Sequence, residues 1–156
     1  KTNEHGVSET YLNGENVEKE IRTLEVANAA SRVSALDFVR RELVRQQQQM
    51  GLQKGIVMDG RDIGTVVFPE AELKIFLTAS PEIRAQRRME EMLARGEKVD
   101  FQKVLANIKE RDERDLHRSE SPLKKAPDAI VIDNSNLTRD EQRELLKTLF
   151  YQKTLE

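Results

Sequence analysis

The chain has 156 residues, which corresponds to one domain of ordinary size and excludes two large ones. Lys and Arg number 26 against 28 Asp and Glu, so no overall positive field draws the chain to nucleic acid or anionic lipid, and any anion site must be a local cluster. Because the chain has no Cys, disulfides, zinc–thiolate sites and thiol nucleophiles are excluded together.

The first third of the chain is predicted to be a hairpin followed by two helices. Residues 6–17 alternate weakly around an Asn-Gly dipeptide, which favours a two-residue turn between strands. The composition is helical over residues 18–49, where Asp37 is expected to cap the second helix. We interpret the Gln46–Gln49 run as the solvated end of that helix.

Short apolar runs predict the strands of the remaining chain. These runs are Ile56–Met58, Leu73–Leu77 and Ala129–Ile132. Between and after them the sequence predicts three helices, each with a capping residue at its start. They are a helix from Pro81 to about Arg95 capped by Ser80, a charged helix from Asp100 through about His117, and a last helix with capping-box spacing at Thr138. Strands alternating with helices predict an α/β fold with a parallel sheet.

The segment after the first predicted strand, residues 59–65 (DGRDIGT), is the first candidate site. Ligands of open α/β sheets lie beyond the carboxyl ends of strands. Arg61 offers a planar fork for phosphate or carboxylate, and Asp62 offers acceptors for amine or hydroxyl donors. The alternative is an ordinary turn in which Arg61 and Asp62 pair with each other.

A second candidate lies on the charged helix. Arg111, Asp115 and Arg118 have the spacing i, i+4 and i+7, which puts two guanidiniums and one carboxylate on one stripe. Such a stripe can hold a phosphate and a sugar hydroxyl. The alternative is a solvated face joined by weak ion pairs.

A third group of arginines lies on the helix after Pro81. It comprises Arg84, Arg87, Arg88 and Arg95, and it can either close over a polyphosphate or form the wet side of an amphipathic helix. His5 and His117 are too isolated in the sequence to predict a metal site.

Together these motifs resemble one family, the bacterial cytidylate kinases. The resemblance rests on GRDIGTVVFPEAELKIFLTAS, the following RRM, and ERDERDLHRSESPL, with EIRTLEVANAASRVSALDFVRREL similar to the family's nucleotide-binding insert. It runs from about Gly6 to Phe150. It implies the parallel-sheet fold of P-loop nucleoside monophosphate kinases and transfer of the γ-phosphoryl of ATP to CMP or dCMP, with Mg²⁺.

The resemblance also implies a division of the chain. Residues 1–50 correspond to the insert that binds the nucleoside monophosphate, residues 51–80 and 119–156 to the core, and residues 81–118 to the lid and its flanking helices. The family is cytoplasmic, and the resemblance implies a monomer, small-molecule substrates, and neither nucleic-acid nor membrane partners.

The resemblance assigns roles to single residues. Ser31, Arg40 and Asp62 stand where the family recognises the cytosine edge; Arg61 and Arg118 stand at the α-phosphate; Arg111 and Asp115 stand near the pentose. Arg84, Arg87 and Arg88 correspond to the lid arginines that approach ATP. Arg61, Arg88 and Arg118 are therefore the expected catalytic group.

One family motif does not occur in the printed sequence. The family begins with a strand, a phosphate loop of the form G-x-x-x-x-G-K-S/T and a helix, and no such pattern is present. Because the chain also starts at Lys1, we expect a C-terminal portion of a cytidylate kinase that recognises CMP but is inactive alone. The alternatives are a non-catalytic CMP-binding regulatory module and a kinase for another nucleoside monophosphate. No apolar stretch approaches the length of a membrane span, and no apolar leader opens the chain.

Overall fold

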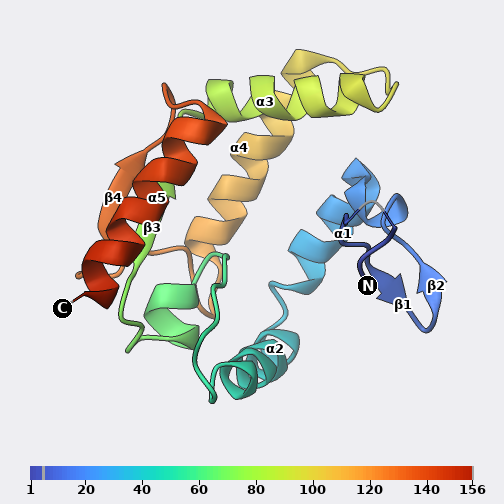
Figure 1. The fold of residues 1–156 in the computed structure, drawn as a ribbon. Helices are drawn as coiled ribbons and strands as arrows, with labels where there is room; N and C mark the ends of the chain where they lie inside the picture. Colours follow the sequence, from blue (N-terminus) through green and yellow to red (C-terminus); the bar gives the residue numbers. More distant parts are fainter. Residues whose placement is uncertain (5, 156) are drawn as a thin grey trace.

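The chain folds into helices around a small parallel sheet (Figure 1). The structure is a computed structural model, and it describes residues 1–4 and 6–155. In chain order the elements are β1 (Tyr11–Leu12), β2 (Glu15–Asn16), the 3-10 turn η1 (Glu20–Arg22), α1 (Leu24–Val33), α2 (Asp37–Met50), the π-helical turn η2 (Ile63–Val67), β3 (Ile75–Thr78), α3 (Pro81–Ala94), α4 (Phe101–His117), β4 (Ile130–Asp133) and α5 (Arg139–Thr154).

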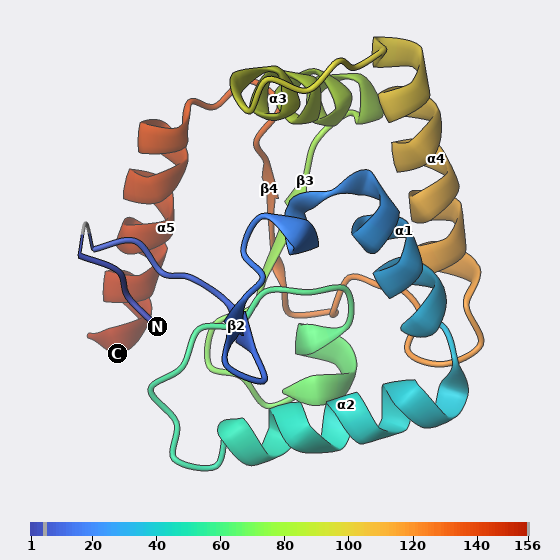
Figure 2. The same ribbon diagram turned by 90° about the vertical axis from the view of Figure 1, so that its right-hand side faces the viewer.

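The parallel strand pair confirms the predicted mixture of helices and parallel sheet. β3 and β4 run side by side from Ile75 opposite Ile130 to Thr78 opposite Asp133. A parallel pair needs a crossover connection, and α3 and α4 provide it. Figure 2 shows α3, α4, α2 and α5 arranged around the two strands, with α1 in front of them.

The helix starts follow the local capping signals in the sequence. The side chains of Ser80, Asp100 and Thr138 each accept a hydrogen bond from a backbone N–H of the following turn, as predicted. At Thr138 the capping box is complete, because Glu141 also accepts a hydrogen bond from the backbone N–H of Thr138. The Asn-Gly turn likewise produces the predicted hairpin of β1 and β2.

Two local predictions are wrong. Asp37 is the first residue of α2 and does not cap it; its carboxylate accepts a hydrogen bond of 2.8 Å from the Ser119 hydroxyl instead. The run Ile56–Met58 has no regular secondary structure, and Val57 is 97% exposed. A strand is stabilised by a hydrogen-bonded neighbour, and none of the strands in the described ranges pairs with this run.

The main hydrophobic core lies between α3 and α4. Ala85 and Met92 of α3 and Val104 of α4 are buried together, and flanking side chains of α4 pack against them. Leu24, at the start of α1, reaches the same cluster. The amino-terminal segment is therefore in contact with the core that α3 and α4 form.

The end of α2 packs closely against the turn that carries Asp62. At Gly51, which directly follows α2, an added Cβ atom would clash with the ring of Phe68, the residue that directly follows η2. Gln48 also donates a hydrogen bond of 3.3 Å to the Val66 carbonyl. This contact fixes α2, and with it Arg40, relative to the turn that begins at Asp62.

We therefore expect Gly51→Ala to lower the free energy of unfolding by about 1–3 kcal/mol, because the added methyl overpacks the contact with Phe68. The backbone at Gly51 has negative φ, so the effect comes from space and not from conformation. Urea unfolding measures it. Phe68→Leu in the same chain opens room for the methyl and should recover part of the loss; a Gly51→Ala chain as stable as the wild type would show that this packing is loose.

Candidate functional site

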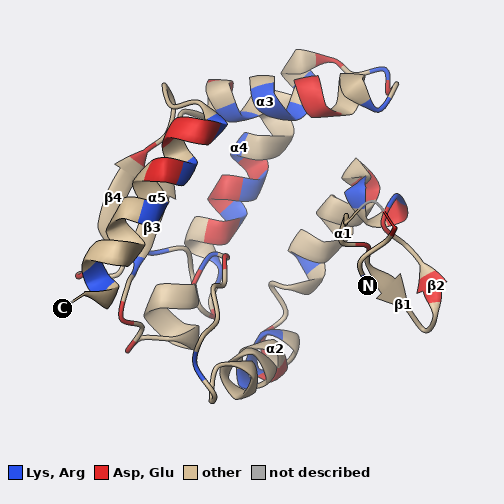
Figure 3. Ribbon diagram, in the orientation of Figure 1, with Lys and Arg blue, Asp and Glu red and all other residues tan. Residues whose placement is uncertain are grey.

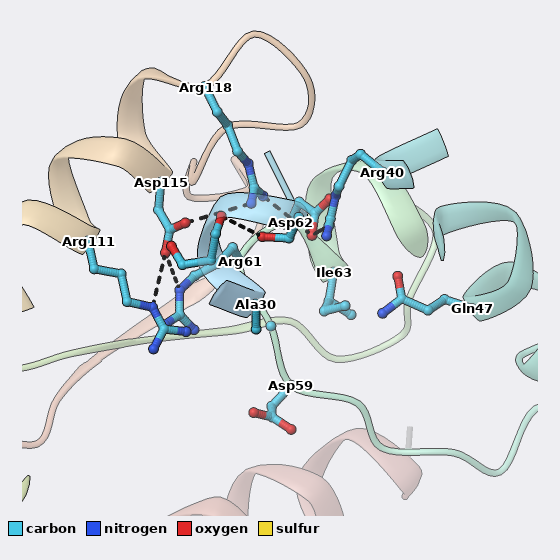
Figure 4. Close-up of a pocket in the computed structure, with 13 residues that line it drawn as sticks. Ala30, Arg40, Gln47, Asp59, Arg61, Asp62, Ile63, Arg111, Asp115 and Arg118 are labelled. Atoms are coloured by element: carbon cyan, nitrogen blue, oxygen red, sulfur yellow. Dashed lines mark hydrogen bonds and ion pairs between the residues drawn. The ribbon is translucent and has the colours of Figure 1, made fainter. Parts of the chain in front are cut away.

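A cavity of about 310 Å³ brings the first two candidate clusters together (Figure 4). Its walls come from α1, α2, the segment before η2, and α4. The lining residues are Ala30, Ser31, Ser34, Arg40, Gln47, Asp59, Gly60, Arg61, Asp62, Ile63, Arg111, Asp115 and Arg118. All seven substrate-binding residues predicted from the sequence line it.

Asp62 is the most deeply buried acid of the cavity, with 2% of its surface exposed. It forms an ion pair with Arg40 of α2, and Arg118 approaches the same carboxylate oxygen at 3.8 Å. The predicted alternative, a pair between Arg61 and Asp62, does not form; Arg61 reaches across to α4 instead. Asp62 is therefore held between residues of two other parts of the chain.

Asp115 of α4 gathers a second set of arginines. The Arg61 Nε donates to its carboxylate at 2.9 Å, while Arg111 and Arg118 approach at 3.9 and 3.8 Å. The predicted stripe of Arg111, Asp115 and Arg118 therefore exists, and it faces the cavity (Figure 4). Figure 3 shows charged residues of both signs along α4. Those of this stripe line the cavity together with residues 59–63.

The backbone at η2 explains how Asp62 and Arg61 come to face different partners. The N–H groups of Val66 and Val67 both donate to the Asp62 carbonyl, at 2.9 and 3.2 Å, at the start of the wide turn of a π-helix. Such turns are frequent at functional sites. Asp62 points towards α2, and the neighbouring Arg61 points towards α4.

The cavity leaves buried polar atoms without hydrogen bonds. Among the described residues, the Nε of Arg40, the Oδ2 of Asp62, the Nε of Arg111 and one terminal nitrogen of Arg118 have no hydrogen-bond partner, while the Oδ1 of Asp62 has only its ion pairs with arginines. Buried polar atoms are ordinarily paired, and each exception needs a reason. A bound ligand with matching donors and acceptors would supply the missing partners.

The cationic groups crowd one another in the cavity. Burial lowers the pKa of Arg111 first, and the neighbouring charge of Arg61 lowers it further, against the raising effect of Asp115. For Arg118, burial again lowers the pKa most and Arg40 adds to it, while Asp62 and Asp115 oppose the change. Crowded, partly desolvated guanidiniums gain from any further anion, so the site favours an anionic ligand.

Sequence reasoning missed part of the wall. The sequence predicts Gln47 to be part of a solvated helix end, but its side chain lines the cavity with a buried carbonyl oxygen that has no hydrogen bond within the described part of the chain. A signal for this position exists, because Gln47 lies seven residues after Arg40 and thus on the same face of α2. Asp59 and Ser34 also line the cavity.

The third cluster lies elsewhere and is largely engaged in structural contacts. Arg84 forms a two-pronged pair with Asp112, at 2.9 and 2.6 Å. Arg87 donates to three backbone carbonyls of the loop after β4, and Arg88 donates to the carbonyl of Arg22 at 3.3 Å. Their predicted role towards ATP stays a prediction.

The described residues do not form a metal site. No group of three or more His, Cys, Asp or Glu side chains in residues 1–4 and 6–155 is arranged to hold a metal ion, and the prediction about His5 lies outside these ranges. Asp62 and Asp115 are paired with arginines, so the cavity does not fit Mg²⁺. None of the described helices is both long and apolar enough to cross a membrane.

A parallel strand pair flanked by helices defines an α/β protein, and the cavity beside it is lined by guanidiniums and carboxylates. Comparison with known proteins makes this specific. The cytidylate kinase profile matches residues 1–151, and the chain belongs to the cytidylate kinase family.

Curated relatives with the same family name agree over almost the whole chain. The cytidylate kinase of Bacteroides thetaiotaomicron is 59% identical over 94% of this chain and 64% of its own length. That of Parabacteroides distasonis is 61% identical over 90% of the chain and 61% of its own length, and that of Flavobacterium psychrophilum is 61% identical over 92% and 64%. The chain thus spans less than two thirds of the length of these relatives.

Proposed function

We propose that the complete protein transfers the γ-phosphoryl group of ATP to CMP or dCMP, and that this chain supplies the acceptor site. Support comes from family membership and from the cavity, in which four arginines surround a space of about 310 Å³. Such a volume lies at the small end of ligand pockets. The arginines can bind a phosphate, and the buried Asp62 can accept a hydrogen bond from a neutral polar group of the same ligand.

The observation that carries the proposal is the polar edge formed by Arg40 and Asp62. Asp62 Oδ1 is held in the ion pair with Arg40, whereas the Arg40 Nε, a donor, and the Asp62 Oδ2, an acceptor, are buried without hydrogen bonds among the described residues. Cytosine presents the complementary pair, an exocyclic amine beside a ring acceptor. Uracil presents a carbonyl and an N–H at those positions, so its binding would leave buried groups mismatched, which is costly.

The remaining arginines are placed for the rest of the nucleotide. We assign Arg61 and Arg118 to the α-phosphate, where their charge would also stabilise the transferring group. Arg111 and Asp115 are assigned to the pentose, whose hydroxyls can both donate and accept. The Arg118 side chain is nearly buried and would hold the phosphate in one position. The Arg61 side chain is more exposed and would adjust to the position of the phosphate.

The donor side of the reaction is assigned to α3 and to parts of the protein outside this chain. Residues 81–118 are the lid of the proposal, residues 1–50 the acceptor insert, and residues 51–80 and 119–156 the core. Among these three lid arginines, Arg88 forms the fewest contacts with its guanidinium. Arg84 and Arg87 would have to release their present partners in order to bind phosphate oxygens.

ATP would bring Mg²⁺. The phosphate loop would lie in the part of the relatives' length that this chain does not cover. Such an enzyme would act as a cytoplasmic monomer.

Kinase assays test this proposal. The complete protein should convert CMP and dCMP to diphosphates with ATP, and the 156-residue chain should bind CMP without producing CDP. Turnover by the short chain would contradict the assignment of the phosphate loop to the rest of the protein. A complete protein that phosphorylates UMP or AMP in preference to CMP would point to another acceptor, and one that binds CMP without any kinase activity would point to a regulatory module.

A further inference from the structure

The chain after α4 folds back on the end of that helix. α4 ends at His117, and the backbone of Arg118 is already extended, with φ −63° and ψ 146°. The backbone N–H of Leu123 then donates to the carbonyl of Asp115, in the last turn of α4, at 2.7 Å. Residues 118–123 therefore form a short closed loop that starts at a cavity arginine and ends at a hydrogen bond to Asp115.

Ser121 lies at the bend of this loop in an unfavourable conformation. Its φ is +50°, in the left-handed region that residues with a side chain rarely adopt. Pro122 follows it, and a residue before proline normally has an extended backbone with negative φ. Strained residues of this kind persist only where the surrounding structure holds them, and they cluster at functional sites.

The backbone of Ser121 supports the guanidinium of Arg118. The Arg118 Nε donates to the Ser121 carbonyl at 2.6 Å, and the Arg118 side chain is only 4% exposed. The direction of a carbonyl depends on the backbone angles of its own residue. The left-handed turn at Ser121 is therefore what brings this oxygen back to the Arg118 Nε.

This contact leaves the other end of the Arg118 guanidinium for a ligand. Its two terminal nitrogens face the cavity, where one lies 3.8 Å from an oxygen of Asp62 and the other 3.8 Å from an oxygen of Asp115 (Figure 4). One of these nitrogens is buried and has no hydrogen-bond partner among residues 1–4 and 6–155. A buried donor that is held in one orientation is preorganised to bind an oxyanion.

We propose that Ser121 is a positioning residue for phosphate binding, because its left-handed backbone directs the carbonyl that holds Arg118 against the phosphate of the nucleotide. This inference rests on the proposed function, which assigns Arg118 to the α-phosphate. Ser121 acts through Arg118 and does not touch the ligand. It therefore affects the binding of CMP and not that of cytidine, which has no phosphate.

Titration of the 156-residue chain with CMP and with cytidine, by calorimetry at one salt concentration, tests the inference. Ser121→Val introduces a β-branched side chain, which strongly disfavours positive φ, so the loop should change its backbone and withdraw the carbonyl from Arg118. We expect CMP affinity to fall about tenfold, as for the loss of one hydrogen bond to a charged group, and cytidine affinity to stay unchanged. In an Arg118→Met background the same substitution should not lower CMP affinity further.

Two variants separate the backbone of Ser121 from other effects. Ser121→Gly removes the side chain but permits positive φ, so it should keep the wild-type ratio of CMP to cytidine affinity. Lys54→Val places the same β-branched side chain at another residue with positive φ, +54°, which does not line the cavity, and it should also keep this ratio. Thermal unfolding of each variant reports whether it is folded at the temperature of the titration.

The outcomes are distinct. A Ser121→Val chain with the wild-type ratio would show that the backbone of Ser121 does not position Arg118. A Ser121→Gly chain with a lowered ratio would show that the side chain is needed, and this result decides against the inference even if Ser121→Val does not fold. The inference is also wrong if Ser121→Val has the same effect with and without Arg118, or if Lys54→Val lowers the ratio equally. A wild-type chain that binds CMP no more tightly than cytidine overturns the phosphate site of the proposed function itself.

Discussion

Asp62→Asn should abolish the preference of the chain for CMP over UMP. Asp62 is 2% exposed, and its carboxylate is the acceptor of the polar edge that it forms with Arg40. The amide of Asn can turn a donor towards the exocyclic amine of cytosine, and it no longer balances the buried charge of Arg40. We expect CMP affinity to fall about 100-fold, corresponding to roughly 2–3 kcal/mol for a hydrogen bond to a charged group.

Calorimetric titration with both nucleotides measures this effect. Asp128→Asn is the matched control, because Asp128 is an exposed carboxylate that pairs with Lys74 and does not line the cavity. This control should keep the wild-type affinities. An Asp62→Asn chain that folds and still discriminates between CMP and UMP as the wild type does would show that another group reads the base.

Asp115→Asn should have the largest effect on stability. The carboxylate of Asp115 is approached by three guanidiniums, those of Arg61, Arg111 and Arg118, and it is nearly buried. Its removal leaves these charges facing one another in a partly desolvated space. We expect the free energy of unfolding to fall by about 3–5 kcal/mol, the range for a buried ion pair that loses one partner.

Inorganic phosphate should then rescue the variant. An anion in the cavity replaces the lost negative charge, so phosphate should raise the unfolding midpoint of Asp115→Asn by more than that of the wild type. Asp112→Asn is the control on the same helix; its partly exposed pair with Arg84 is worth about 1 kcal/mol or less. Equal midpoints for Asp115→Asn and the wild type would mean that the arginines do not depend on this carboxylate.

Features with local causes could be predicted from the sequence. The caps at Ser80, Asp100 and Thr138 and the Asn-Gly turn each depend on a few neighbouring residues, and all of them form where expected. The Ile56–Met58 run fails as a strand for the opposite reason. A strand requires a partner that can lie anywhere in the chain, and periodicity does not report it.

The candidate site likewise contains some features that the sequence predicts and others that it does not. The stripe of Arg111 and Asp115 follows from helical spacing, so the sequence alone predicts it. The pairing of Arg61 with Asp115 joins residues that are 54 positions apart and depends on the π-helical turn at η2, for which the sequence offers no clear signal. The resemblance to cytidylate kinases selects residues that line one cavity, but the pairs that hold them, including Arg114 with Ser31, depend on how the helices pack.

The central claim is that these arginines and carboxylates form one site for a cytosine nucleotide. The most direct measurement is a titration of the 156-residue chain with CMP, UMP and cytidine, by calorimetry at a fixed salt concentration. We predict that CMP binds more tightly than cytidine, because Arg61 and Arg118 hold its phosphate, and more tightly than UMP, because Arg40 and Asp62 read its base. Equal affinities for CMP, UMP and cytidine would contradict the claim.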